Sequence, residues 1–347
     1  MARLSRLQAA LSGADLDALL ATAPADLRLL TGFSGSAGTL LVTRSDARLL
    51  VDPRYTRRAA SETGLPVSEY PKREEWTGAL AALCEGRRSV GAQARHLLAA
   101  EWQELALALN GELTPADDLL TPLRELKTRD EVADLKAAGD LTWRAIDKAL
   151  EGLEAGTTER ELAAAVARGL LAEGDGLAFP VIAAFGAATA DPHAAPTDRR
   201  LAPGDLVLVD AGAKVRGWCG DVTVTTVFGA PDRRQADYLT LTERALAAAE
   251  AAAVPGASGG DVDEAARAVY REAGLEHLTL KGVGHGLGLE VHEAPRLVEG
   301  GEAKLQNGHV FTLEPGLYVE GWGGIRMERM YALADDALVP LSPWPRP

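Results

Sequence analysis

The chain has 347 residues, and 47% of them are apolar, enough for a large core and, by length, for about two domains. Its net charge of −14 opposes attraction to nucleic acid and to anionic lipid, so we expect neither as a partner. Only Cys84 and Cys219 are present, without CxxC spacing, and no run approaches the roughly 20 apolar residues of a membrane span. Asp15 and Asp17 interrupt the apolar N-terminus, which argues against a signal peptide and predicts a cytoplasmic protein.

The first third of the chain alternates short helical patterns with two apolar, strand-like runs, at residues 39–43 and 47–51. This alternation predicts an α/β unit. A polar stretch marked by prolines follows at residues 115–122 and predicts a connection between domains. We therefore place an α/β domain at residues 1–125 and a second domain at residues 126–347.

The second domain contains a weak internal repeat with an offset of 100 residues. In each copy a turn glycine precedes a capping box and an amphipathic helix that ends at a glycine. The corresponding positions are Gly156, Thr158, Glu161, Leu162 and Gly174 in one copy, and Gly256, Ser258, Asp261, Val262 and Gly274 in the other. A long helix, predicted at about 129–151 and about 233–253, precedes each copy. Duplication would give a curved antiparallel sheet with helices outside and a cleft between the halves; a chance match of two capped, alanine-rich helices is the alternative.

Four carboxylates of this domain adjoin strand-like runs, where a charge is costly unless it is paired or coordinated. They are Asp210, Asp221, Glu314 and Glu328. Asp210 and Asp221 flank a turn that contains glycine, lysine and arginine, so a hairpin can bring them to one point. Period two puts Thr223 on the face of Asp221, where its hydroxyl can orient a ligand. By the same periodicity Arg326 and Glu328 share a face of the last strand, and a structural ion pair is the alternative interpretation of these two residues.

The segment Gly284–Glu293 is rich in glycine and contains two histidines. Its glycines lack the GxGxxG spacing of a dinucleotide fold, and His292 does not begin an HExxH motif because Arg296 holds the second histidine position. We expect His285 in a tight loop with exposed backbone. A lone histidine is more often structural than a ligand, but four nearby carboxylates change that balance. The combined set predicts a dinuclear site for Mn²⁺, Co²⁺ or Zn²⁺.

With these motifs the chain resembles the metal-dependent Xaa-Pro peptidases, the family of prolidase and aminopeptidase P. The resemblance covers nearly the whole chain and begins in the N-terminal domain, at Leu30–Phe33 and Asp52–Tyr55. The family motifs DxGxxxxGxxxD, GHGxGLxxHE, TxEPGxY and GxRxE fall on Asp210–Asp221, Gly284–Glu293, Thr312–Tyr318 and Gly324–Glu328. The resemblance implies a creatinase-like α/β N-terminal domain and an α+β catalytic domain with the "pita-bread" fold.

The resemblance also implies how two divalent metal ions would be held. Asp221 and Glu328 would bridge them, Asp210 would hold one ion, and His285 and Glu314 would hold the other. A hydroxide that bridges the metals would then attack the peptide bond before proline.

Catalytic and substrate-binding residues follow from the same resemblance. The catalytic group would comprise His193, His292, Glu314 and Arg326, with Glu314 as the proton carrier. The two histidines would also face the substrate and hydrogen-bond its scissile carbonyl. Arg296 matches a basic position that in prolidases can meet the carboxylate of the substrate.

Two positions depart from the family pattern. An arginine is common three residues after the second aspartate, where this chain has Val224, and a histidine is frequent four residues before the ligand histidine, where it has Lys281. Neither is one of the five candidate ligands, so we expect metal binding, while the preferred substrate length and the proton path stay open. Arg54 and Arg44 are alternatives to Arg296 for the substrate carboxylate.

The predicted function is a Xaa-Pro dipeptidase that acts on small peptides with proline at the second position, and the predicted assembly is a homodimer. An aminopeptidase P that acts on longer peptides is the alternative, because the family match separates the two poorly. The N-terminal domain argues against methionine aminopeptidase, and the complete ligand set argues against creatinase-like catalysis without metal. A non-catalytic binding protein on the same fold would be expected to have lost a ligand.

Overall fold

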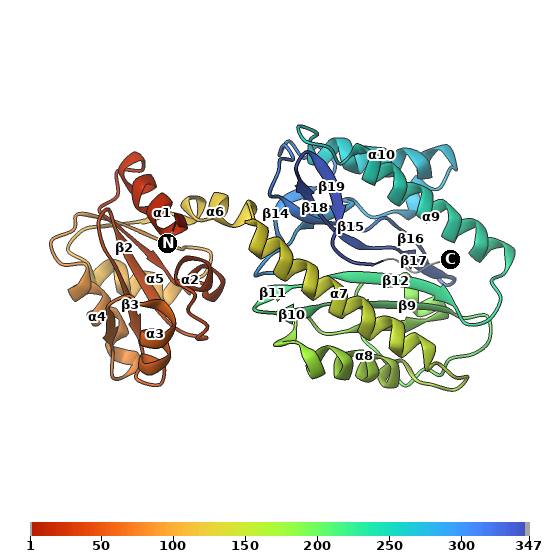
Figure 1. Cartoon of the computed structure of the whole chain (residues 1–347), viewed down its shortest axis with the longest axis horizontal. Coiled ribbons are helices and arrows are strands. Elements are labelled where there is room, and N and C mark those ends of the chain that lie inside the picture. Colours follow the sequence, from red (N-terminus) through yellow and green to blue (C-terminus); the bar gives the residue numbers. More distant parts are fainter. Residues whose placement is uncertain (1, 344–347) are drawn as a thin grey trace. The chain divides into compact units, whose positions relative to one another are not determined.

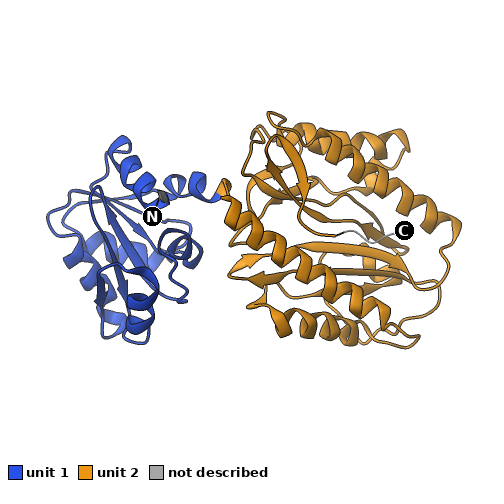
Figure 2. Ribbon diagram, in the orientation of Figure 1, with its two compact units in different colours: residues 1–124 blue, residues 125–347 orange. Residues whose placement is uncertain are grey.

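The computed structural model describes residues 2–343. The chain forms two compact units, which we call unit 1 (residues 1–124) and unit 2 (residues 125–347) (Figure 2). No helix within the described residues is both long enough and apolar enough to cross a membrane.

Unit 1 is built on a mixed sheet with the strand order β4-β3-β2-β1-β5-β6. Strand β1 pairs antiparallel with β2 and parallel with β5, and the outer pairs β3/β4 and β5/β6 are parallel. The strands are β1 (Ala18–Ala21), β2 (Thr39–Thr43), β3 (Ala47–Val51), β4 (Val67–Glu69), β5 (Ser89–Ala92) and β6 (Glu112–Pro115). The helices are α1 (Ala2–Gly13), α2 (Pro24–Thr31), α3 (Thr56–Thr63), α4 (Trp76–Leu83), α5 (Ala99–Ala108) and α6 (Thr121–Glu125). The two strand-like runs of the sequence are β2 and β3, and the predicted α/β class is confirmed.

Both faces of this sheet are buried, which explains the uninterrupted apolar runs of its central strands. Leu40 and Leu49 point into one apolar cluster, which they share with residues of α1 and α2. Their neighbours Leu41 and Leu50 point into a second cluster, with residues of α4 and α5. Successive side chains of a strand alternate between its faces, so a sheet covered on both sides needs apolar residues at every position.

Unit 2 places two helical pairs outside antiparallel strands, and Figure 1 shows α7 and α8 over one half and α9 and α10 over the other. The helices are α7 (Arg129–Glu151), α8 (Glu159–Glu173), α9 (Arg233–Ala252) and α10 (Gly259–Glu272). Strands of the first half are β7 (Gly176–Leu177), β8 (Ile182–Phe185), β9 (Leu206–Ala211), β10 (Ala213–Val215), β11 (Trp218–Cys219) and β12 (Val222–Val227). Strands of the second half are β13 (Gly284–Gly286), β14 (Glu293–Leu297), β15 (Val310–Leu313), β16 (Gly316–Val319), β17 (Gly323–Arg326), β18 (Arg329–Ala334) and β19 (Ala337–Pro340).

The capping boxes predicted from sequence are formed in both halves. Thr158 accepts a hydrogen bond from the Glu161 amide at 3.2 Å, and the Glu161 carboxylate accepts one from the Thr158 amide at 2.8 Å. Ser258 and Asp261 exchange the same pair of bonds at 3.1 and 2.7 Å. Each box satisfies amides that would otherwise lack a partner at the start of α8 or α10.

The turns before these helices are equivalent as well. Gly156 and Gly256 have φ angles of 90° and 87°, in the left-handed region that glycine adopts without strain. Their amides donate to the carbonyls of Leu201 and Leu305, each at 2.8 Å. Equivalent turns and caps at an offset of 100 residues, with equivalent bonds to Leu201 and Leu305, confirm that unit 2 consists of two related halves.

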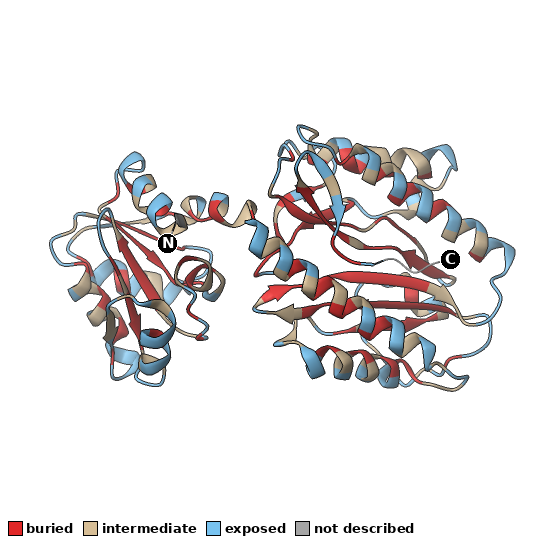
Figure 3. Ribbon diagram, in the orientation of Figure 1, coloured by how far each residue is buried: buried red, intermediate tan, exposed pale blue. Residues whose placement is uncertain are grey.

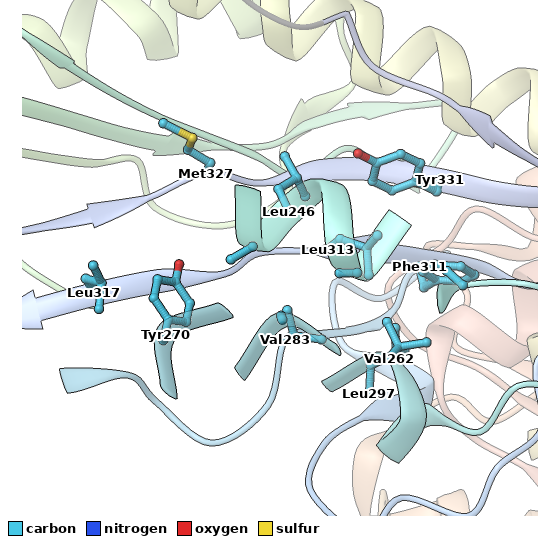
Figure 4. Packing of buried hydrophobic residues seen from close by; sticks show 14 of the residues in the cluster. Leu246, Val262, Tyr270, Val283, Leu297, Phe311, Leu313, Leu317, Met327 and Tyr331 are labelled. Atoms are coloured by element: carbon cyan, nitrogen blue, oxygen red, sulfur yellow. The ribbon is translucent and has the colours of Figure 1, made fainter. Parts of the chain in front are cut away.

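Each half has its own apolar core between its helices and its strands, and Figure 3 shows the strands as buried ribbons. In the first half, residues of α7 and α8 pack on the sheet β12-β9-β8. In the second half, Val262 and Tyr270 of α10 pack near Phe311 and Leu313 of β15 (Figure 4). The sheet there has the order β14-β13-β15-β18-β19. All strand pairs described in unit 2 are antiparallel, as the duplication hypothesis predicts.

Candidate metal centre

The hairpin β9/β12 brings two of the candidate ligands to one place. Asp210 stands opposite Thr223 in the register of the two strands, and Asp221 immediately precedes β12. Because strand positions two apart share a face, all three side chains lie on the same side. At the neck of the hairpin a Cβ on Gly212 would lie 2.1 Å from the Gly220 carbonyl oxygen, so only glycine fits. The predicted convergence of the two carboxylates is therefore confirmed.

Helix α7 fixes this hairpin from behind through a buried threonine. The Thr142 hydroxyl accepts a hydrogen bond from the Ala213 amide at 2.9 Å and donates one to the Ala138 carbonyl at 2.7 Å. Thr142 is fully buried. The buried backbone amide of Ala213 is thereby satisfied, which holds the start of β10 in position.

His285 lies in a strand and not in the loop that its glycine-rich setting suggested. It occupies the centre of β13, between β14 and β15, and is 5% exposed. A Cβ on Gly284 would lie 2.0 Å from the Thr312 carbonyl oxygen, and one on Gly286 would lie 2.0 Å from that of Ala294. The expectation of a tight, exposed loop was wrong because these glycines serve the close approach of neighbouring backbone rather than a turn.

The setting of Glu328 also differs from the prediction. Strand β17 ends at Arg326 and β18 begins at Arg329, so Glu328 lies in the crossing between two sheets, and β18 and β19 follow it. Its amide donates to the Thr223 carbonyl at 3.0 Å. Arg326 forms its ion pair with Asp210 and not with Glu328. The alternative interpretation, an ion pair between Arg326 and Glu328, was therefore wrong, because the chain leaves the regular strand between the two residues.

Carboxylate oxygens and an imidazole nitrogen converge where these elements meet. The candidate ligand atoms of Asp221, His285 and Glu328 all lie within 4.8 Å of one another. The Nε2 atom of His285 is 3.6 Å from an Asp221 oxygen and 3.4 Å from a Glu314 oxygen. Asp210 adds a buried Oδ1 atom that has no hydrogen-bond partner among the described residues.

Burial and like charge make this cluster unfavourable without a cation. Burial raises the pKa of Asp221 and of Glu328 well above the ordinary value, and the neighbouring carboxylates raise both further. Burial lowers the pKa of His285 to about 4, so the ring is neutral, and its Nδ1 lies 3.1 Å from the Gly286 carbonyl. With Nδ1–H as donor to that carbonyl, the lone pair of Nε2 faces carboxylate oxygens. A buried site in which hydrogen-bond acceptors face one another suits divalent cations, because the cations can coordinate the lone pairs of these atoms.

A network of hydrogen bonds orients the carboxylates. Thr223 donates its hydroxyl to Glu328 at 2.7 Å, as the polar face of the strand predicted. Arg326 donates to the Thr223 hydroxyl at 3.1 Å, to Asp210 at 2.7 Å and to the Tyr318 hydroxyl at 3.0 Å. The sequence identified Tyr318 only as the last residue of a motif. Its hydrogen bond with Arg326 depends on the pairing of β16 with β17, which the motif alone does not predict.

Two of the expected substrate-facing residues, His292 and Arg296, lie next to His285. His292 is exposed, and its ring centroid is 4.4 Å from that of His285 in an edge-to-face arrangement. Arg296 stands opposite His285 in the β13/β14 pair. Burial lowers the pKa of His292, and the charge of Arg296 lowers it further. His193 is exposed, its amide donates to Asp191 at 3.0 Å, and its charge also lowers the pKa of His292.

The positions that depart from the family pattern lie away from the cluster. Val224 is 4% exposed and points into the apolar core of the first half. Lys281 is exposed, and its Nζ atom lies 3.2 Å from Oε2 of Glu299. In unit 1, Arg54 forms two hydrogen bonds with Asp52, at 3.1 and 2.7 Å.

The duplicated halves, with buried carboxylates and a neutral imidazole where their strands meet, define a metal-dependent hydrolase of the pita-bread fold. The chain belongs to metallopeptidase family M24, which residues 133–335 match. Residues 3–126 match the creatinase/prolidase N-terminal domain. Both parts of the predicted fold are thereby confirmed.

Known relatives align over nearly the full chain. A Xaa-Pro dipeptidase of Pyrococcus horikoshii is 33% identical over 316 residues, which cover 90% of this chain and 89% of the relative. The solved structure of a Xaa-Pro dipeptidase from Bacillus anthracis matches with a TM-score of 0.96 at 26% identity, over 100% of this chain and 98% of that one. An X-Pro aminopeptidase from Thermotoga maritima matches with a TM-score of 0.90 at 29% identity, over 96% and 97%.

Proposed function

We propose that this hydrolase is a dinuclear Xaa-Pro dipeptidase that cleaves the bond before proline in small peptides with proline at the second position. The observation that carries the proposal is the convergence of Asp221, His285 and Glu328 within 4.8 Å in a buried site. The similarity to relatives named Xaa-Pro dipeptidase supports the substrate class. A non-catalytic binding protein on the same fold would have little reason to retain such an unfavourable cluster.

Five residues would hold two divalent ions. Asp221 and Glu328 would be shared between the ions, Asp210 would complete one set, and His285 with Glu314 would complete the other. When bound, a pair of Mn²⁺, Co²⁺ or Zn²⁺ ions supplies a water of lowered pKa and positive charge for the developing oxyanion. Two observations support this assignment: Oδ1 of Asp210 has no hydrogen-bond partner among the described residues, and Nε2 of His285 faces carboxylate oxygens.

The supporting residues keep the carboxylates in position for this chemistry. Arg326 and Thr223 each hold one carboxylate, at Asp210 and Glu328, through bonds of 2.7 Å. Because these donors leave the other oxygen of each carboxylate available, they orient the ligands without occupying them. Arg326 therefore acts in the proposal by holding Asp210, and its bond to Tyr318 anchors it to the neighbouring strand β16.

Proton transfer would fall to residues that reach the open side of the site. The Glu314 side chain is 28% exposed, more than the side chains of its neighbours Asp221 and His285, so it can exchange a proton with the substrate. His292 and His193 are exposed beside the cluster and would hydrogen-bond the scissile carbonyl. An imide nitrogen has no N–H before cleavage, so recognition must use these contacts and the shape of the proline ring.

Arg296 would bind the free carboxylate that a dipeptide presents directly after its proline. A guanidinium can hold such a carboxylate with two parallel hydrogen bonds. Arg296 is exposed and stands opposite His285 in the β-sheet, which supports this role. An aminopeptidase that accepts longer peptides is the second candidate, and the similarity to the Thermotoga maritima X-Pro aminopeptidase favours it.

The test compares Ala-Pro, Ala-Pro-Ala and Ala-Ala as substrates, with and without a chelator. The proposal predicts that Ala-Pro is cleaved fastest, that Ala-Ala is cleaved poorly, and that the chelator abolishes hydrolysis. Faster cleavage of Ala-Pro-Ala would replace the dipeptidase assignment by the aminopeptidase assignment. Hydrolysis that survives removal of metal would contradict both.

A further inference from the structure

A buried ion pair joins the start of unit 2 to the loop that carries His292. The Nζ atom of Lys127 lies 3.1 Å from Oε2 of Glu293, and the two side chains are 0% and 4% exposed. The residues are 166 positions apart in the sequence. Lysine and glutamate are seldom buried this completely, and doing so is costly, which calls for an explanation beyond stability.

Glu293 closes the loop that precedes it. Its Oε1 atom accepts a hydrogen bond from the Glu290 amide at 3.1 Å, while Oε2 faces Lys127. A Cβ on Gly288 would lie 2.4 Å from Oε2, so the absence of a side chain there admits the carboxylate. The carboxylate of Glu293 therefore contacts both the Glu290 amide and Lys127, and Glu293 directly follows His292 in the sequence.

Lys127 is itself rigidly anchored. Its amide donates to the Gly308 carbonyl at 2.8 Å, and the adjacent Leu126 forms a β-bridge with His309. The next residue, Thr128, is the N-cap of α7. The ammonium group thus projects from a segment whose backbone is fixed on both sides, which makes it a firm support for the loop.

We propose that Lys127 and Glu293 are positioning residues that hold the loop 287–292 so that the His292 ring stays beside His285. The 4.4 Å spacing of the two rings is the geometry that the ion pair would maintain. Neither positioning residue is among the candidate metal ligands. The inference rests on the proposed function in that it assigns His292 a role with substrate.

The central test is a double-mutant cycle between Lys127 and His292. Lys127→Met should lower kcat for Ala-Pro on the order of 10²-fold, since a displacement of about 1 Å can cost that much, and leave KM and metal content near those of the parent. In a His292→Ala background the same substitution should change kcat by less than about twofold, because the group that it positions is gone. An equal loss of kcat in both backgrounds would overturn the proposal.

A control and a compensated variant separate positioning from stability. Lys136→Met removes an exposed lysine of α7 that pairs with Asp140, and it should leave kcat unchanged. Lys127→Met combined with Glu293→Gln removes both buried charges, so thermal stability should recover while kcat stays at least about tenfold below the parent. Recovery of kcat together with stability would show that the pair is merely structural. Should Lys127→Met fail to fold, Glu293→Gln alone must show the same loss of kcat.

A readout that needs no activity distinguishes failure of this inference from failure of the proposed function. Amide hydrogen exchange of metal-free protein should become faster in residues 287–292 of the Lys127→Met variant and stay unchanged in β9. Unchanged exchange in the loop would overturn the positioning role even if the parent cleaves Ala-Pro. If the loop of the Lys127→Met variant exchanges faster but the parent cleaves no proline peptide, the proposed function is refuted and the positioning role of the ion pair stands.

Discussion

Replacing Asp221 by asparagine should stabilise the metal-free protein and at the same time prevent it from holding two ions. Asp221 is 4% exposed, and its ligand atom lies within 4.8 Å of that of Glu328. Two unit charges at 4.8 Å repel each other by about 3.5 kcal/mol at an effective dielectric constant of about 20. Proton uptake by one carboxyl relieves part of this repulsion, so we expect a gain of about 1 to 2 kcal/mol in the free energy of unfolding.

The assay is urea unfolding of chelator-treated parent and Asp221→Asn protein, followed by the same two titrations with excess Mn²⁺. Without metal the variant should be the more stable protein. With metal the order should reverse, because ions that bind only the folded state stabilise the parent by mass action. The reversal is the signature of a carboxylate that is retained for metal binding and not for folding.

Asp205→Asn is a matched control. Asp205 is also largely buried, but it accepts two hydrogen bonds from Arg199, at 2.9 and 2.8 Å. Its replacement should cost about 1 kcal/mol or more with or without metal. An Asp221→Asn protein that is less stable than the metal-free parent, or that still binds two ions as the parent does, would contradict this prediction.

The remaining predictions concern the substrate side, pH and assembly. His292→Ala should lower kcat by a factor of about 10² to 10⁴ while the protein keeps its metal, and loss of metal measured by elemental analysis would instead make His292 a ligand. Arg296→Ala should weaken Ala-Pro hydrolysis through KM by about 1.5 to 3 kcal/mol and affect Ala-Pro-Ala less; equal effects on both peptides would remove Arg296 from carboxylate binding. Burial lowers the pKa of His309 to about 4, below its ordinary value of about 6.5, and its Nδ1 accepts from the Gln306 amide at 3.3 Å. The unfolded chain therefore binds this proton more tightly, and the free energy of unfolding should fall by up to about 3 kcal/mol as pH drops from about 6.5 to about 4; urea titrations of His309→Asn should lack this component, and an unaltered pH dependence would contradict it. Light scattering should return a dimer mass at micromolar concentration, and a monomer mass would contradict the predicted assembly.

Features encoded by neighbouring residues were predictable from the sequence. The capping boxes at Thr158 and Ser258 follow from a hydroxyl and a carboxylate three positions apart, and both are formed. The hairpin between Asp210 and Asp221 follows from two strand patterns around a turn, and its register places Asp210 opposite Thr223. In each case the partners are close in the chain, so local geometry alone brings them together.

Features that depend on distant backbone were not predictable in the same way. The glycines beside His285 indicated a turn, but they make room for Thr312 and Ala294 of neighbouring strands. Glycine is compatible with a turn and with close packing, and only the tertiary structure distinguishes them. The buried pair of Lys127 and Glu293 gave no signal, since nothing in either local sequence indicates a partner 166 residues away.

The most direct test of the proposed dinuclear centre counts the divalent ions that the chain binds. Chelator-treated protein would be titrated with Mn²⁺, with bound metal and Ala-Pro hydrolysis measured at each step. The five proposed ligands predict saturation at two ions per chain, with hydrolysis that appears only as metal binds. Saturation at one ion per chain, or Ala-Pro hydrolysis by protein that holds no ion, would contradict the dinuclear centre.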